Sequence, residues 1–178
     1  MSFPFALVLV LNQTSMEYVV GAMTAVVCVM QVAPVKSNDG SGVSANIAVR
    51  DLLGLDCEIV GVVAENAPAY ALSYEAGHVV STESADTFVD GVACRVPDPD
   101  AVERVIAGCA RIVRISEADA AKAMVLMYRA THNLAEPAGS LALAAVLAEG
   151  ERVAGRKVAM ILTGGNCDLD VLEAAARR

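Results

Sequence analysis

The chain has 178 residues, of which 56% are hydrophobic and 4% aromatic, and its formal net charge is −8. This length suits one domain with a sizeable core, and the excess of small apolar residues is typical of an α/β domain with buried parallel strands. The acidic balance and the absence of a basic cluster argue against nucleic acid as a partner. Five cysteines without a Cys-x-x-Cys pair indicate reduced thiols in the cytoplasm rather than disulfides or zinc.

The first 35 residues are strongly apolar, and Glu17 is their only charged side chain. Residues 5–11 and 26–35 favour strands, but we assign no domain to residues 1–35 and place the α/β domain at residues 36–178. The uncharged run 18–35 also has the length of a membrane span, although no positive charge precedes it. A membrane anchor is therefore the alternative to a cytoplasmic protein.

A polar, glycine-containing loop over residues 36–42 separates the second strand from a helix predicted over 43–53. It ends in Gly40-Ser41-Gly42. A strand, a loop of this kind and a helix together cradle phosphate, because backbone N–H groups and the helix N-terminus favour an anion. Asp39 would repel phosphate, so a plain turn is the alternative.

Strands and helices alternate from residue 56 to the C-terminus. Strands are predicted over 58–64, 110–115 and 157–162, and helices over 68–75, 98–107, 116–131, 141–148 and 169–176. Residues 81–97 form a loop-rich passage between them. The alternation predicts a mostly parallel sheet with helices on both faces.

Several helix ends have recognisable caps. Asp98 and Ser116 are suited to N-caps, and His132 is expected to cap the C-terminus of the helix 116–131 rather than to bind a metal. Three residues at helical spacing are predicted to lie in the core: Met124, Met127 and Tyr128.

Two strand ends carry candidate ligand-binding residues. In open α/β sheets ligands bind beyond the carboxyl ends of the strands. Thr163-Gly164-Gly165-Asn166 follows one strand, and its two glycines allow backbone to approach a ligand closely. An ordinary turn, with Asn166 or Asp168 as the next N-cap, is the alternative. Glu65 follows another strand and is either a metal or polar-ligand residue or a solvated loop carboxylate.

These motifs together resemble a known family. Glu136-Pro137-Ala138-Gly139, followed about 25 residues later by Thr163-Gly164-Gly165-Asn166, resembles the C-terminal half of pyridoxal-phosphate enzymes of the threonine dehydratase and serine racemase family. The stretches 50–55, 59–62 and 90–93 look like the same family in the same order. The resemblance covers about residues 40–176. It implies the large domain of a fold-type-II enzyme, truncated at its N-terminus.

The resemblance also implies roles for individual residues. The cofactor-binding set would be Gly40, Ser41, Gly42, Glu136, Thr163, Gly164 and Gly165, in which Thr163 offers a neutral hydroxyl to the pyridine nitrogen. Asp90 and Gly91 would border the substrate. Glu65 and the Ala69 carbonyl match a divalent-cation site of some members, but Ala71 stands where the third, acidic ligand would be.

The family reaction converts L-threonine or L-serine to a 2-oxo acid plus ammonia, and it needs a Schiff-base lysine in a Ser-Phe-Lys-x-Arg context. Lys36, Lys122 and Lys157 are the lysines of this chain, and none has that context. Lys122 and Lys157 are expected to face solvent. We therefore expect a threonine dehydratase-like lyase domain that is inactive alone. The alternative is a non-catalytic module that pairs with a copy of itself or another subunit.

Overall fold

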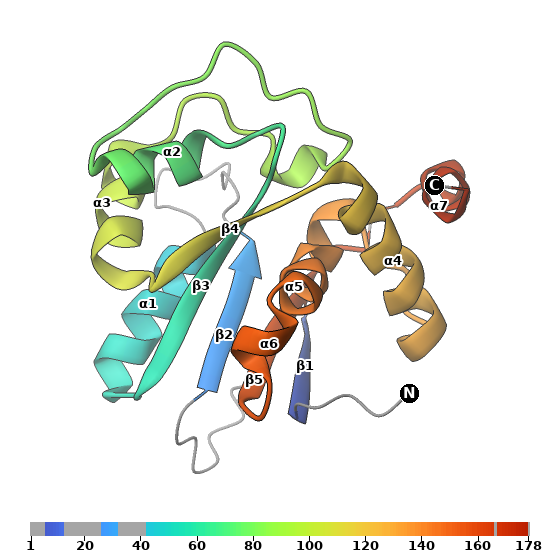
Figure 1. Cartoon of the computed structure of the whole chain (residues 1–178), viewed down its shortest axis with the longest axis horizontal. Coiled ribbons are helices and arrows are strands. Elements are labelled where there is room, and N and C mark those ends of the chain that lie inside the picture. Colours follow the sequence, from blue (N-terminus) through green and yellow to red (C-terminus); the bar gives the residue numbers. More distant parts are fainter. Residues whose placement is uncertain (1–5, 13–25, 32–41, 166, 178) are drawn as a thin grey trace.

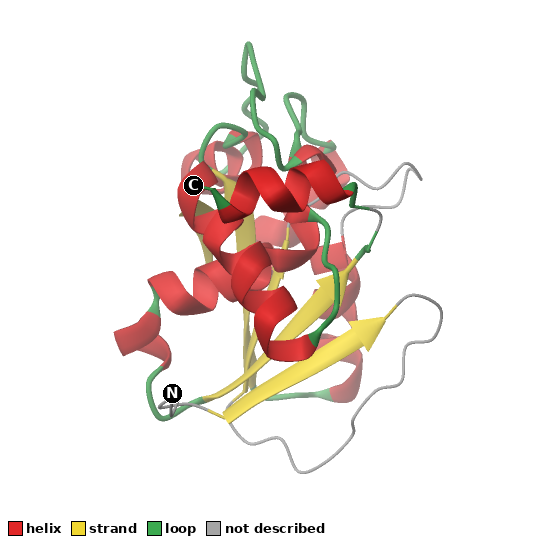
Figure 2. Ribbon diagram, turned by 90° about the vertical axis from the view of Figure 1, so that its right-hand side faces the viewer, coloured by secondary structure: helices red, strands yellow, loops and turns green. Residues whose placement is uncertain are grey.

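The computed structural model of the chain describes residues 6–12, 26–31, 42–165 and 167–177. Its strands form one sheet in the order β1-β5-β2-β3-β4 (Figure 1). They are β1 (Ala6–Asn12), β2 (Val26–Gln31), β3 (Cys57–Ala64), β4 (Arg111–Ile115) and β5 (Lys157–Thr163). All four pairings are parallel, and Figure 2 shows β1 and β5 side by side with the same direction.

Helices cover the two faces of this sheet (Figure 1). They are α1 (Gly42–Leu53), α2 (Ala69–Ala76), α3 (Pro99–Gly108), α4 (Glu117–Thr131), α5 (Pro137–Ala148), α6 (Gly150–Val153) and α7 (Leu169–Ala176). A short 3-10 helix, η1 (Asp90–Val92), lies in the loop between α2 and α3. The predicted α/β class, with a parallel sheet between helices, is confirmed.

The central strand β3 shows why the sheet is covered on both faces. Successive strand side chains point to opposite faces. Val60 and Val62 pack in a core layer with α4 and α5, whereas Ile59 and Val63 pack in a second layer with α1, α2 and α3. All four side chains are buried, as expected of a continuous apolar run in a parallel sheet.

Helix α5 is apolar on all its sides because it is enclosed. Its residues from Pro137 to Val146 are buried, including the large side chain of Leu141. Alanines at many of these positions allow α5 to approach both α4 and the sheet. The sequence predicted the body of this helix over 141–148, opened by residues 136–140, and the structure starts it at Pro137, a first helical position that suits proline.

The predicted caps are present. The side chain of Asp98 accepts the Ala101 N–H at 2.9 Å, and that of Ser116 accepts the Asp119 N–H at 3.1 Å. His132 ends α4 in the left-handed conformation, with φ of 58°. The predicted core position of Tyr128 is wrong, because its side chain lies on the outer face of α4 and is 45% exposed.

The N-terminal third contributes two strands. β1 pairs with β5 at one edge of the sheet, and β2 lies between β5 and β3. Part of the apolar run 18–35 is thus strand β2. Among the helices of the described ranges, none is both long and apolar enough to cross a bilayer. The predicted phosphate loop up to Ser41, with Lys36, lies outside the described residues.

Candidate functional site

Three segments meet at the carboxyl ends of the strands. Gly164 and Gly165 directly follow β5, Glu136 is the N-cap residue of α5, and η1 carries Asp90 and Gly91. Because the sheet is parallel, the carboxyl ends of β3 and β5 lie on the same side of it, and ligands of open α/β sheets bind on that side. The structure therefore brings together five of the residues that the resemblance had singled out.

Glu136 is in direct contact with the glycine turn after β5. Its backbone N–H donates a hydrogen bond to the Gly164 carbonyl oxygen at 3.3 Å. Gly164 has φ of +76°, and a Cβ built on it would overlap the Glu136 carboxyl group. Glycine is required at this position both by the backbone conformation and by the space that the carboxyl group occupies.

The turn at η1 approaches the same carboxyl group. A Cβ built on Gly91 would lie 2.7 Å from the Ala138 Cβ and 3.7 Å from Glu136 Oε1. The η1 turn is closed by the Val92 N–H, which donates to the Val89 carbonyl oxygen at 3.0 Å. Two glycines from distant parts of the chain thus flank one glutamate.

The electrostatics of the site follow from this packing. Partial burial, and then the charge of Asp90, raise the pKa of Glu136 above its ordinary value. Burial also raises the pKa of the Cys167 thiol, with smaller contributions from Asp168, Glu136 and Asp90. Glu136 therefore retains its proton to a higher pH than a solvated glutamate.

Other predicted residues are placed as follows. Thr163 is the last residue of β5, paired with Asn12 of β1, and its side chain is not described. Gly42 begins α1, and its carbonyl oxygen accepts the Asn46 side-chain amide at 2.8 Å. Gly40 and Ser41 lie outside the described residues.

The two predicted cation ligands lie close together in the sequence, at the end of β3 and the start of α2. Glu65 is exposed directly after β3, and Ala69 is buried at the start of α2. Within the described ranges, no group of three or more His, Cys, Asp or Glu residues is arranged to hold a metal ion. A cation at Glu65 and the Ala69 carbonyl stays a prediction of the resemblance.

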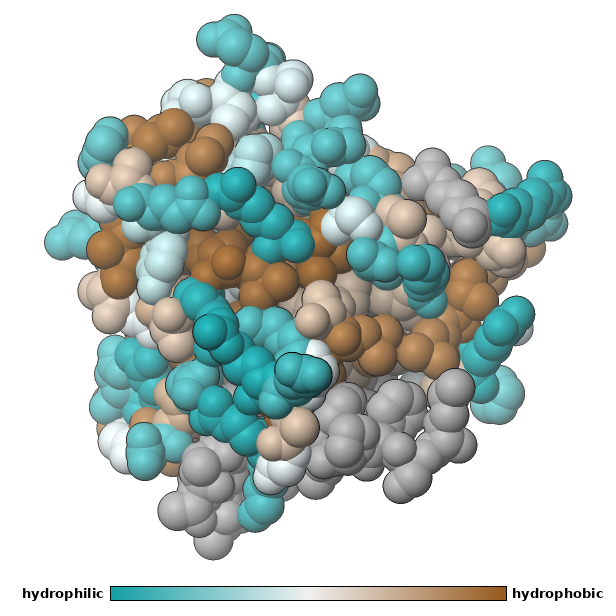
Figure 3. Space-filling view, in the orientation of Figure 1, coloured by the Kyte–Doolittle hydropathy of each residue, from teal (hydrophilic) through white to brown (hydrophobic). Residues whose placement is uncertain are grey.

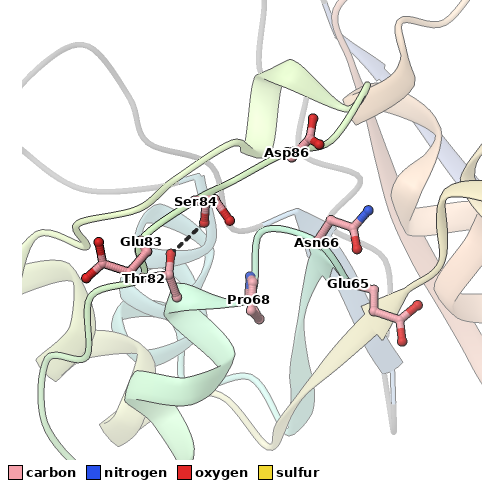
Figure 4. Close-up of a pocket in the computed structure, with 7 residues that line it drawn as sticks. All are labelled: Glu65, Asn66, Pro68, Thr82, Glu83, Ser84 and Asp86. Atoms are coloured by element: carbon pink, nitrogen blue, oxygen red, sulfur yellow. Dashed lines mark hydrogen bonds between the residues drawn. The ribbon is translucent and has the colours of Figure 1, made fainter.

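A hollow of about 410 Å³ lies beside this site, between the end of β3 and the loop after α2 (Figure 4). It is lined by Glu65, Asn66, Pro68, Thr82, Glu83, Ser84 and Asp86. Of these, sequence reasoning had singled out only Glu65, as a candidate ligand. No sequence pattern pointed to residues 82–86, because only the tertiary fold brings them to the end of β3.

The described lysines do not fit a covalently held pyridoxal phosphate. Lys122 Nζ pairs with Asp119 Oδ1 at 2.9 Å, and the Lys122 side chain is 68% exposed on α4. Lys157 is the first residue of β5 and Gly164 follows the last, so the length of the strand, about 23 Å for seven residues of extended chain, separates the two. Lys122 is thus paired on the surface of α4, and Lys157 lies at the end of β5 away from the glycine turn.

Comparison with known proteins decides the family. The model of the family described as pyridoxal-phosphate dependent enzyme matches residues 32–164. The chain belongs to this family. It is 31% identical over 133 residues to the L-threonine ammonia-lyase of Thermotoga maritima, covering 75% of this chain and 32% of that protein. It is 30% identical to the catabolic L-threonine dehydratase of Escherichia coli K12, covering 73% and 40% of the two.

Further relatives extend the same pattern. The beta-hydroxyaspartate dehydratase of Paracoccus denitrificans is 29% identical over 79% of this chain and 44% of its own length. The crystal structure of a threonine deaminase from T.th. superposes with a TM-score of 0.70 at 27% identity, covering 81% of this chain and 50% of that one. Maize serine racemase, at 20% identity and a TM-score of 0.71, shares the fold.

These findings confirm the resemblance to threonine dehydratases and to the large domain of fold-type-II enzymes. The chain spans between 32% and 44% of the length of the three curated relatives named above. It is a threonine dehydratase-family pyridoxal-phosphate domain, and what the longer relatives do comes to this chain only as a proposal.

Proposed function

We propose that this chain forms the ring side of a pyridoxal-phosphate site of the threonine dehydratase type and that, alone, it does not deaminate threonine or serine. The contact of the Glu136 carboxyl group with Gly164 beside η1 supports the ring side. The positions of Lys122 and Lys157, away from that contact, support the absence of activity. Pyridoxal phosphate, when bound, would supply the electron sink for amino-acid chemistry.

The residues divide the task of binding such a cofactor. Gly164 and Gly165 would present bare backbone to the ring, Glu136 would lie against it, and Thr163 would offer its hydroxyl to the ring nitrogen. Gly40, Ser41 and Gly42 would hold the phosphate at the N-terminus of α1. Asp90 and Gly91 would border an amino-acid substrate. Relatives named for L-threonine support that substrate class.

The test is a titration of the purified chain with pyridoxal phosphate, followed by borohydride reduction and peptide mapping. We expect no specific Schiff-base absorbance, labelling scattered over Lys36, Lys122 and Lys157, and no 2-oxobutanoate from L-threonine. One specifically labelled lysine together with 2-oxobutanoate formation would contradict the proposed inactivity. Substitution of each lysine by alanine in turn would then identify the reacting residue.

The second candidate is a non-catalytic module that pairs with another subunit or with itself. It is favoured by exposed apolar side chains, namely Leu52, Leu53, Val96, Tyr128, Leu147 and Leu169. Figure 3 shows a hydrophobic band across the middle of the molecule, where β4 and α4 lie in Figure 1. Such surface is a common sign of an interface. A mass measured by light scattering that stays monomeric up to high concentration would count against self-association.

A cytoplasmic location is part of the proposal. Cys57, Cys94, Cys109 and Cys167 are free thiols in the described part of the chain, as reducing conditions would keep them. Fractionation of cells that express the full chain tests this location, with recovery in the membrane pellet as the contrary result.

A further inference from the structure

A carboxylate outside the candidate site holds the segment that leads into η1. Glu117 Oε1 accepts the Thr87 hydroxyl at 2.6 Å, and Glu117 Oε2 accepts the Phe88 backbone N–H at 3.1 Å. Thr87 Oγ1 in turn accepts the Val89 N–H at 3.0 Å. One side chain thus binds residues 87–89, directly or through Thr87, immediately before Asp90.

We call the hydrogen bonds from Glu117 to Thr87 and Phe88 the Glu117 clamp, and helix α4 holds Glu117 in place. Glu117 is the first residue of α4, whose N-cap is Ser116, so its carboxylate lies at the favourable end of the helix dipole. The following turns of α4 are held by Ala120 and Met124, which are buried. Hydrogen bonds to a carboxylate are shorter and stronger than those between neutral groups. The Glu117 clamp therefore attaches residues 87–89, which belong to the loop between α2 and α3, to the first turn of α4.

The position of η1 in the site depends on this attachment. Gly91 lies so close to α5 that an added Cβ would be 2.7 Å from the Ala138 Cβ, so a small displacement of the turn changes the contact. Asp90, on the same turn, lies near enough to Glu136 for its charge to act on that carboxyl group.

The geometry points to Glu117 as a positioning residue that holds the Asp90–Gly91 turn against Glu136. That this turn forms one wall of a cofactor site rests on the proposed function. That Glu117 holds the turn in position does not, and it can be tested without cofactor, so either claim can fail without the other. No sequence pattern singled out this role, because Glu117 and Thr87 are 30 residues apart and meet only in the fold.

Native-state hydrogen exchange of the full chain tests the placement directly. The Val92 N–H donates to the Val89 carbonyl oxygen and the Ala93 N–H to that of Asp90, both at 3.0 Å, so these amides report on η1. In Glu117→Gln, which loses one acceptor, and in Thr87→Val, we expect their protection to fall at least about tenfold. Thr87→Ser keeps the hydroxyl, so the Val92 and Ala93 amides should stay protected from exchange in that variant. Glu103→Gln, an exposed helical glutamate on α3, is the control.

A carbon-13 titration of Glu136 by NMR in the same variants gives a readout that a general loss of stability would not move. Asp90 contributes to the raised pKa of Glu136, so release of η1 should lower that pKa towards its ordinary value. We expect this lowering in Glu117→Gln and Thr87→Val and not in Thr87→Ser or Glu103→Gln. Pyridoxal-phosphate binding is measured separately.

Two results overturn the assignment. One is unchanged exchange of the Val92 and Ala93 amides, with an unchanged Glu136 titration, in both clamp variants. The other is loss of protection throughout the sheet in both variants, since Glu117 would then support the whole domain rather than the turn. A chain that binds no pyridoxal phosphate but shows the local effect leaves the clamp in place and contradicts only the proposed function.

Discussion

Gly164 is the residue on which the geometry of the candidate site depends most directly. Its left-handed backbone and the Glu136 carboxyl group beside it both exclude a side chain. Gly155 offers a matched comparison, because it has nearly the same conformation, with φ of +74°, and nothing within 4 Å of an added Cβ. The two glycines therefore separate the cost of the backbone conformation from the cost of the contact.

We expect Gly155→Ala to lower the free energy of unfolding by about 1 kcal/mol, which is the cost of the left-handed conformation. Gly164→Ala should cost about 2 to 4 kcal/mol, because overlap with Glu136 adds to the same strain. Urea denaturation of both variants measures the difference. The double variant Gly164→Ala with Glu136→Ala should recover part of the loss, and equal effects at the two glycines would contradict the contact.

The raised pKa of Glu136 predicts how the stability of the fold changes with pH. Because its pKa is raised in the folded state, the folded chain binds this proton more tightly than the unfolded chain. The stabilisation is complete below the ordinary pKa and is lost as the pH rises through the raised one. The stability of Glu136→Gln relative to the unsubstituted chain should therefore increase as the pH rises above the ordinary pKa of glutamate.

Glu58 provides the opposite case for comparison. Hydrogen bonds from Arg111 and then Arg156 lower its pKa, so its contribution is present above the ordinary pKa and is lost as the pH falls. Glu58→Gln should thus lose most stability, relative to the unsubstituted chain, near neutral pH. Guanidinium denaturation at several pH values checks both variants, and trends of the same sign would contradict the environment described for one of the two carboxyl groups.

At the scale of the elements, an ion-pair network joins β3, β4 and the turn between α5 and α6. Arg111 of β4 donates to both oxygens of Glu149 at 2.7 and 2.6 Å and to Glu58 at 2.7 Å. Arg156 also donates to Glu58, at 2.8 Å, and Arg152 to Glu149, at 3.3 Å. The network lies at the end of the sheet away from the candidate site, so it serves the fold rather than the chemistry.

We expect Arg111→Ala to destabilise the chain by about 2 to 4 kcal/mol, because it leaves two partly buried carboxylates short of their main partner. The Arg111 side chain is 17% exposed. Arg114→Ala on the same strand should cost about 0.5 kcal/mol, since its pair with Glu75 lies on the surface. Thermal unfolding followed by circular dichroism compares them, and similar losses would contradict the role of the network.

For the whole molecule, the central question is whether the two core layers unfold together. Strand β3 contributes Val60 and Val62 to one layer and Ile59 and Val63 to the other, so neither layer can open without exposing the same strand. Tyr70 is buried in the layer formed with α1, α2 and α3, and Leu141 in the opposite layer. These residues give a probe and a perturbation on opposite faces of the sheet.

Leu141→Ala should lower the free energy of unfolding by about 2 to 5 kcal/mol because it leaves a cavity in α5. We expect the tyrosine absorbance, which includes Tyr70, to shift to the same lower denaturant midpoint as the far-ultraviolet circular dichroism. Leu147→Ala is the control, since Leu147 on the same helix is 41% exposed. A tyrosine transition that keeps its midpoint while the helical signal moves would mean that the layers are independent.

The alternation of elements, their approximate bounds and most of their caps follow from the linear order of the residues. These depend on local chemistry: apolar periodicity, N-cap hydroxyls and carboxylates, and glycines at helix ends such as Gly77, which has φ of +75°. The set of motifs that marks the family is also a property of the linear order. The exposed position of Tyr128 escaped prediction, because spacing places a residue on a helix face without saying what covers that face.

Which residues meet across the molecule depends on the three-dimensional fold. The strand order β1-β5-β2-β3-β4 is not the chain order, and it brings the end of β5 beside elements that come much earlier in the sequence. The contacts of Glu136 with Gly164 and Gly91, and the clamp of Glu117 on Thr87, join segments separated by about 30 to 45 residues. Such pairs leave no periodic trace in a sequence, because their geometry is set by sheet register and helix packing.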